Sequence, residues 1–183
     1  MTAVPSNWLL TGSPRVGKTT ALERTIKLLD ASGFTPGGVM APAIYRDGDR
    51  VGFGLVDVLT DARVDMAHVD FTTGPTVGKY HVDVEAIDRL SAMAFHRADD
   101  AADLFVVDEI APMELTSDVF IEAVTRALDS STPLVGVVHR SDGGFIGAVK
   151  ARPDTEVRTV TGDNRDALPD RLADRVEAAS RDI

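Results

Sequence analysis

Short apolar runs alternate with amphipathic segments along most of the chain. Runs of the kind that form strands cover residues 7–11, 104–107, 133–139 and 156–161. Segments with apolar residues every three or four positions, as in a helix with one buried face, cover residues 18–32, the stretch from residue 84, and residues 118–128 and 166–180. This alternation predicts an α/β fold in which helices sandwich a mostly parallel sheet.

The segment at about residues 36–83 follows a different pattern. Residues 38–45 are apolar and extended, and residues 51–59 alternate between bulky and small side chains. The turn signal Asp-Gly-Asp at residues 47–49 lies between these two runs, which favours a hairpin. A further strand is expected at residues 63–69. We therefore predict a β-hairpin-rich insertion at 36–83 rather than another strand and helix unit.

The length of the chain and the lack of an internal boundary indicate one domain. The 183 residues are enough to bury a core without disulfides or a structural metal. We find no repeat, low-complexity tract or linker, and the glycines of residues 141–153 predict a loop or a short helix. Residues 1–183 are therefore expected to form a single domain.

A glycine-rich motif, G-x-x-x-x-G-K-[ST], lies directly after the first predicted strand. It consists of Gly12, Ser13, Pro14, Arg15, Val16, Gly17, Lys18 and Thr19, and Thr20 follows it. Its glycines let backbone N–H groups converge on phosphates, and the predicted helix that follows presents its positive N-terminal end. Lys18 is placed to reach the β- and γ-phosphates, and the Thr19 hydroxyl to ligate Mg²⁺. The alternative is a chance glycine turn, but the position between a strand and a helix favours a nucleotide-binding loop.

Two acids, Asp108 and Glu109, follow the apolar run at residues 104–107. In a protein with a phosphate loop, Asp108 is the candidate for the Walker B aspartate that holds Mg²⁺ or its water shell. Glu109 would then orient a water molecule for attack on the γ-phosphate. By itself the pair could equally be a solvated strand end, but the motif upstream favours the catalytic interpretation.

With these motifs the sequence resembles the THEP1-type nucleoside-triphosphatase family, also called the cancer-related nucleoside-triphosphatase family, over essentially its whole length. The matching blocks are residues 12–20, 37–39, 50–53, 77–83, 107–110, 113–115 and 164–165. The resemblance implies a RecA-like α/β core. It also implies slow, Mg²⁺-dependent hydrolysis of ATP, GTP, CTP, UTP and TTP to the diphosphate and phosphate, with broad base specificity.

The sequence departs from the family pattern at three places. Arg15 stands where the family usually has glycine, and it either lies over the γ-phosphate or stays in solvent. Ala111 and Pro112 stand where the family usually has Gly-Lys, so any role of that lysine is absent here. The insertion has Pro42 and Ala43 where paired acids are common, which puts a catalytic role of the insertion in doubt.

A few other polar residues are weaker candidates. Glu114 either assists the attacking water or is a solvated loop acid. Arg140, after a predicted strand, could supply the cation that arginine fingers supply elsewhere. Asn164 and Arg165 are expected to begin the last helix, where they either contact the base or form a helix cap with a solvated arginine.

The combined prediction is a nucleoside-triphosphate phosphohydrolase in which Lys18 and the loop amides bind phosphates, Thr19 and Asp108 hold Mg²⁺, and Glu109 activates water. One alternative is a P-loop kinase that transfers the γ-phosphate to a nucleoside or another small acceptor. The other is a switch protein whose slow hydrolysis resets the binding of a protein partner.

Charge and composition narrow the class of partners and the location. The formal net charge of -10 disfavours DNA, RNA and anionic membranes, because phosphate binding needs clustered cations. High aspartate and few lysines resemble the surfaces of salt-adapted proteins, although an ordinary acidic protein is the alternative. The chain has no cysteine, no membrane-length apolar run and no predicted targeting segment, so we expect a cytoplasmic protein. The sequence leaves the oligomeric state open, and we favour a monomer.

Overall fold

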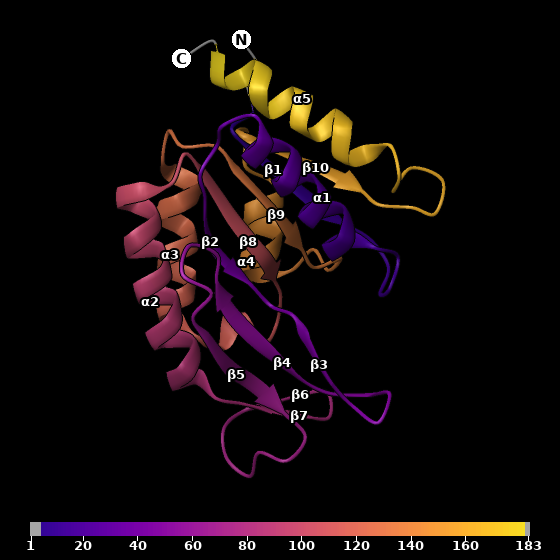
Figure 1. Cartoon of the computed structure of the whole chain (residues 1–183). Helices are drawn as coiled ribbons and strands as arrows, with labels where there is room; N and C mark the ends of the chain where they lie inside the picture. Colours follow the sequence, from indigo (N-terminus) through magenta and orange to yellow (C-terminus); the bar gives the residue numbers. More distant parts are fainter. Residues whose placement is uncertain (1–4, 182–183) are drawn as a thin grey trace.

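The computed structural model describes residues 5–181, whose secondary structure follows the predicted alternation of strands and helices (Figure 1). The core strands are β1 (Asn7–Thr11), β2 (Pro36–Met40), β8 (Leu104–Ile110), β9 (Leu134–Val138) and β10 (Thr155–Thr159). The helices are α1 (Lys18–Ala31), α2 (Val84–Ala101), α3 (Asp118–Asp129), α4 (Gly144–Lys150) and α5 (Leu168–Arg181), with a 3-10 turn, η1, at Glu114–Thr116. Because residues 1–4 and 182–183 lie outside the described part, one domain over 1–183 stays a prediction.

The described strands form one ten-stranded sheet in the order β10-β1-β9-β8-β2, followed by β4 (Asp49–Asp57), β5 (Arg63–His68), β7 (Tyr80–Val82) and β6 (Thr76–Val77), with β3 (Ala43–Arg46) paired to β4. Neighbours among the first five strands are parallel to one another. Strand β9 lies between β1, which leads into the glycine-rich motif, and β8, which carries the acidic pair. This separation is the RecA-like order, so the predicted fold class is confirmed.

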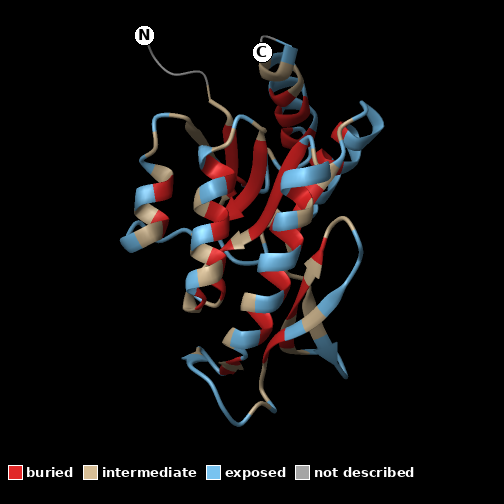
Figure 2. Ribbon diagram, turned by 90° about the vertical axis from the view of Figure 1, so that its left-hand side faces the viewer, coloured by how far each residue is buried: buried red, intermediate tan, exposed pale blue. Residues whose placement is uncertain are grey.

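Helices cover both faces of the parallel strands, and the side chains explain why. Successive residues of a strand point to opposite faces of the sheet. Trp8 and Leu10 of β1 therefore pack in one apolar cluster with residues of α1 and α5, whereas Leu9 packs in a second cluster with residues of α2, α3 and α4. Figure 2 shows the buried parallel strands between helices whose outer faces are exposed.

The insertion extends the same sheet beyond β2 with antiparallel strands. These are β3 (Ala43–Arg46), β4 (Asp49–Asp57), β5 (Arg63–His68), β6 (Thr76–Val77) and β7 (Tyr80–Val82), which lie together at the lower end of Figure 1. The predicted hairpin is present as β3 and β4. Its turn residues Asp47 and Gly48 have φ values of 52° and 86°, as a tight two-residue hairpin turn requires.

Three boundaries differ from the predictions. The single extended run expected at 38–45 is broken at Pro42, which has no backbone N–H for a strand ladder, so β2 joins the parallel core and the insertion proper begins with β3. Strand β8 continues through Asp108 and Glu109 instead of ending before them. The last helix begins at Leu168, with Pro169 in its first turn as expected.

An ion pair attaches the insertion to helix α2. Asp57, at the end of β4, is fully buried, and its carboxylate accepts a hydrogen bond from the Arg97 guanidinium of α2. The other carboxylate oxygen accepts a hydrogen bond from the backbone N–H of Leu59 at 2.9 Å. The carboxylate is thus buried with both oxygens bonded.

None of the helices described here has the length and apolarity needed to cross a membrane. The expected monomeric state and cytoplasmic location stay predictions.

Candidate active site

The glycine-rich loop connects β1 to α1, and its two fixed glycines shape it. Gly12 has a φ of 149°, and a Cβ there would lie 2.8 Å from the backbone oxygen of Val160. Gly17, directly before α1, has a φ of 108°. Both values belong to backbone conformations that favour glycine, so the loop shape depends on these two positions.

Lys18 reaches back across the loop from the first turn of α1. Its Nζ donates hydrogen bonds to the carbonyl oxygens of Gly12 at 3.0 Å and Ser13 at 3.1 Å. These bonds hold the ammonium group against the loop, where an incoming phosphate would meet it.

Thr19 and Asp108 meet although 89 positions separate them in the sequence. The Thr19 hydroxyl donates a hydrogen bond to Asp108 Oδ2 at 3.0 Å. Asp108 is only 2% exposed, and burial, with Glu109 as the second cause, raises the pKa of its carboxyl to about 7 against the opposing Thr19 hydrogen bond. The structure therefore brings together the two side chains predicted to hold a cation.

The donor atoms of this pair fit a divalent cation. A hydroxyl and a carboxylate are hard oxygen ligands, and Mg²⁺ is typically held by one or two carboxylates together with phosphates and water. The described residues contain no cluster of three or more His, Asp or Glu side chains that would hold a metal by themselves. A cation beside Asp108 would also favour the ionised carboxylate that burial disfavours. The pair therefore suits a cation that arrives with a nucleotide.

A bulge in β8 marks the position of the acidic pair. Val107 is opposite Gly136 of β9, but the next paired residues are Ile110 and Val138, so β8 advances by one residue more than β9. Bulges bend a strand and change the direction of side chains, and they are frequent beside active sites. Sequence reasoning did not predict this irregularity, because it depends on the pairing between two strands.

The main cavity is a hollow of about 690 Å³ that contains most of the predicted site residues. Most of the glycine-rich loop, the acidic pair and residues 111–114 line it together with Arg140. The insertion contributes a further wall, which includes Arg50 and Tyr80. Sequence reasoning did not select these insertion residues, although both lie in blocks that match the family.

Glu109 is partly buried in the main cavity. Burial raises the pKa of its carboxyl above the ordinary value, and the Lys18 ammonium acts in the opposite direction. Glu109 thus shares the main cavity with Lys18, Thr19 and Asp108, and its role in activating water stays a prediction.

Glu114, at the start of η1, also lines the main cavity and is only 3% exposed. Its Oε2 atom has no hydrogen-bond partner among the described residues. Burial raises the pKa of this carboxyl well above its ordinary value. Glu114 is therefore not the solvated loop acid that was one of its two interpretations.

Replacing Glu114 with glutamine is expected to remove part of the pH dependence of stability. A carboxyl whose folded-state pKa is raised binds more protons when folded, so the free energy of unfolding falls as the pH rises above the ordinary value of 4.5. Urea unfolding of wild type and Glu114→Gln from about pH 5 to about pH 8 should show a shallower decline in the variant. Strongly reduced turnover with normal stability would instead assign Glu114 a role in attack by water.

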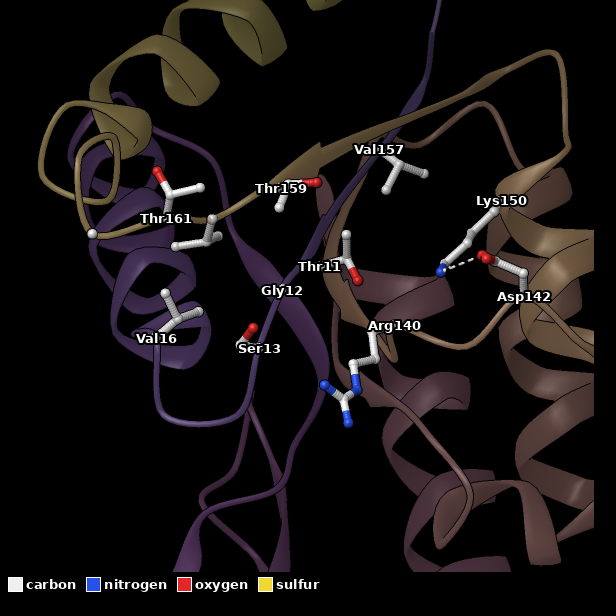
Figure 3. Close-up of a pocket in the computed structure, with 12 residues that line it drawn as sticks. Thr11, Gly12, Ser13, Val16, Arg140, Asp142, Lys150, Val157, Thr159 and Thr161 are labelled. Carbon is white, nitrogen blue, oxygen red and sulfur yellow. Dashed lines mark hydrogen bonds and ion pairs between the residues drawn. The ribbon is translucent and has the colours of Figure 1, made fainter.

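A second hollow, the side cavity of about 740 Å³, adjoins the other side of the glycine-rich loop (Figure 3). Gly12 and Arg140 line both cavities, and Figure 3 shows the Arg140 side chain extending toward Ser13. Ser13 and Val16 of the motif line the side cavity. Lys150 is also there, but its Nζ already donates to the Asp142 carboxylate at 3.0 Å.

Asn164 and Arg165 lie in the turn before α5 and do not begin the helix as expected. The Asn164 side chain accepts a hydrogen bond from the Thr161 N–H at 2.8 Å and donates one to the Thr159 carbonyl at 2.8 Å. It therefore fixes the loop rather than capping a helix. The Arg165 Cδ would lie 3.6 Å from a Cβ built on Gly17, so this side chain is close to the phosphate loop. Contact of either residue with a base stays a prediction.

The fold and the loop together define a P-loop nucleoside-triphosphatase of the RecA-like type. A family model described as NTPase matches residues 7–173. The chain is 42% identical over 169 residues to the nucleoside-triphosphatase THEP1 of Thermofilum pendens, covering 91% of this chain and 93% of that one. It is 39% identical over 175 residues to the THEP1 of Methanopyrus kandleri, covering 94% and 96%. The chain belongs to the THEP1 family of nucleoside-triphosphatases, as the sequence resemblance indicated.

Two solved structures have the same fold. The solution structure of a human cancer-related nucleoside triphosphatase is 30% identical, with a TM-score of 0.79, and the match covers 96% of this chain and 98% of that one. The crystal structure of THEP1 from Aquifex aeolicus is 24% identical, with a TM-score of 0.83, and covers 93% and 99%. At that identity the second match supports the fold alone.

Proposed function

We propose that this protein hydrolyses nucleoside triphosphates to the diphosphate and phosphate in a Mg²⁺-dependent reaction. The observation that carries the proposal is the hydrogen bond between Thr19 and Asp108, which places a hydroxyl and a carboxylate in the cavity that contains Lys18 and Glu109. The relatives that bear the name nucleoside-triphosphatase support the same reaction.

Each group has a distinct task in the proposed site. The backbone N–H groups of Ser13 and residues 15–19 and the Lys18 ammonium bind the phosphate oxygens, whereas Pro14 has no N–H to donate. Thr19 and Asp108 would hold Mg²⁺, which would supply positive charge to neutralise the phosphates. Glu109 orients a water molecule toward the γ-phosphorus.

The proposed reaction cleaves one bond and forms one. The water oxygen bonds to the γ-phosphorus while the bond between that phosphorus and the oxygen bridging to the β-phosphate breaks. The electron pair of the broken bond stays on the diphosphate, and Glu109 accepts a proton from the attacking water. The products are a nucleoside diphosphate and inorganic phosphate.

The proposed enzyme accepts ATP, GTP, CTP, UTP and TTP. The groups assigned to binding contact phosphates and a cation, which all five nucleotides share. The Asn164 side-chain amide is hydrogen-bonded to the loop backbone through both its oxygen and its nitrogen. Few of its donor and acceptor positions therefore remain for a hydrogen bond to a base. Broad base specificity follows from recognition centred on the triphosphate.

Phosphate release from each of the five nucleotides, with Mg²⁺ and then with excess chelator, tests the proposal. We expect release at comparable rates from all five and loss of release with the chelator, because the Thr19–Asp108 pair needs a cation to act on phosphate. Repeating the assay at low and molar KCl tests the proposed salt adaptation, for which activity should persist at high salt.

The outcomes of the same assay separate the alternatives. Release that starts only when a nucleoside or another acceptor is added would indicate a kinase. A very slow rate combined with nucleotide-dependent capture of one protein partner would indicate a switch protein. No affinity of the folded protein for any triphosphate would contradict all three functions.

A further inference from the structure

The insertion places one arginine in the main cavity without a protein partner for its charge. Arg50, on β4, lines the cavity together with Lys18, Asp108 and Glu109. Among the described residues, no carboxylate lies within ion-pair distance of its guanidinium, and only its Nε donates a hydrogen bond. By contrast, Arg46 on the neighbouring strand is paired with Asp70.

Two aromatic residues hold the Arg50 side chain in place. Its Nε donates a hydrogen bond to the Tyr80 hydroxyl at 3.3 Å, and that hydroxyl donates to the Arg50 carbonyl oxygen at 3.3 Å. The guanidinium lies over the Phe53 ring, 5.0 Å from its centroid. Phe53 and Tyr80 in turn pack edge to face, with centroids 5.3 Å apart. The guanidinium is therefore oriented before any ligand arrives.

The unused part of this side chain suits a phosphate group. The two terminal nitrogens of Arg50 make no hydrogen bond to any described residue, so their N–H groups remain as donors. A guanidinium presents such donors in a planar fork that matches two phosphate oxygens. In a chain with 29 acidic residues and a net charge of -10, a cation left unpaired in the cavity indicates an anion that comes from outside.

Two other arginines of the main cavity are placed differently. Arg15 is on the glycine-rich loop itself, is exposed and has a φ of 62°. Arg140 lies between the main cavity and the side cavity. Of the three, Arg50 belongs to the insertion wall, and within the described part of the chain it is the one fixed by a hydrogen bond and an aromatic ring.

We propose that Arg50 contacts the terminal phosphate of the bound nucleotide and stabilises the negative charge that develops there during hydrolysis. The insertion then completes the active site by adding a cation from a wall that the glycine-rich loop does not provide. This inference rests on the proposed hydrolysis of nucleoside triphosphates. It assigns a catalytic role to the insertion although the acids common at residues 42–43 are absent here.

The test compares Arg50→Gln and Arg50→Lys with Arg46→Gln, a matched control on the same insertion whose arginine does not line the cavity. Single-turnover phosphate release from ATP should be at least about 10²-fold slower in Arg50→Gln, partly restored in Arg50→Lys and unchanged in Arg46→Gln. The Kd for a fluorescent, non-hydrolysable ATP analogue should change less than about 10-fold in all three.

A transition-state mimic separates a catalytic role from a merely structural one. Wild type and Arg46→Gln should retain ADP in the presence of aluminium fluoride and Mg²⁺, because the planar fluoride occupies the position of the transferred phosphoryl group. Arg50→Gln should bind ADP but should not retain the fluoride complex. Equal retention in Arg50→Gln and wild type, or equal turnover, would overturn the proposal.

Folding and the parent proposal are checked separately. If Arg50→Gln does not fold, Tyr80→Phe provides a second test, because it removes the hydroxyl that orients the Arg50 guanidinium and keeps the ring against Phe53. Tyr80→Phe should slow single-turnover release without weakening analogue binding, and an unchanged rate would count against the assignment. An inactive wild type would refute the proposed hydrolysis, whereas an active wild type with an equally active Arg50→Gln refutes only the role of Arg50.

Discussion

Replacing Glu109 with glutamine is expected to lower turnover about 10²-fold or more and to leave nucleotide affinity near that of wild type. Glutamine keeps the size of the side chain but cannot accept a proton from the attacking water. The substitution leaves the phosphate-binding groups in place, because Lys18 and Thr19 lie on α1. Their hydrogen bonds go to the Gly12 carbonyl oxygen and to Asp108. Single-turnover hydrolysis and analogue binding, measured on the same preparation, give the two quantities.

A matched control excludes a general effect of removing one negative charge. Glu122 is an exposed acid on α3, outside the main cavity, and Glu122→Gln should hydrolyse ATP at the wild-type rate. Normal hydrolysis by Glu109→Gln would show that another group activates the water. Loss of binding and turnover together would instead assign Glu109 to the binding of phosphate or cation.

Replacing Arg97 with methionine is expected to lower the free energy of unfolding by about 3 kcal/mol. The substitution leaves the Asp57 carboxylate, which is 0% exposed, without the cation that faces it. A buried charge without a partner is strongly destabilising, while the partial exposure of Arg97 moderates the loss. Urea unfolding followed by circular dichroism gives the quantity directly.

Two further variants test the cause of that loss. Arg89→Met removes an arginine that pairs with Glu85 on the solvent side of the same helix, and it should cost less than about 1 kcal/mol. Adding Asp57→Asn to Arg97→Met should recover part of the stability, since the buried charge is then gone. A double variant no more stable than Arg97→Met would indicate that lost packing of the arginine stem, not the charge, is responsible.

Several features of this protein could be predicted because they depend on residues close together in the chain. The glycine-rich loop spans eight consecutive residues, and the strand before it and the helix after it have clear periodic patterns. The hairpin turn at Asp47 and Gly48 is likewise a local signal. The order of the parallel strands was reached through resemblance to a family and not through any local pattern.

Other features depend on pairing between distant segments, and local patterns do not specify that pairing. Residues 36–40 were assigned to the insertion because the extended run at 38–45 was expected to form one arm of a hairpin, yet they pair with β8 in the parallel core. The bulge at Asp108 and Glu109 exists only relative to β9. Asn164 was expected at a helix start, but its bonds to the backbone of residues 159–161 keep it in a turn.

The sequence by itself determined that the chain has a phosphate-binding loop, an acidic pair at the end of an apolar strand, and a sheet sandwiched by helices. Each of these features depends on the spacing of residues that are close together in the chain. That spacing determines the backbone conformation and the buried face of a helix or strand. Only the tertiary structure brought Thr19 within 3.0 Å of Asp108 and placed Arg50 in the same cavity. Those contacts depend on the order and register of the strands, which are determined by packing between segments that are distant in the sequence.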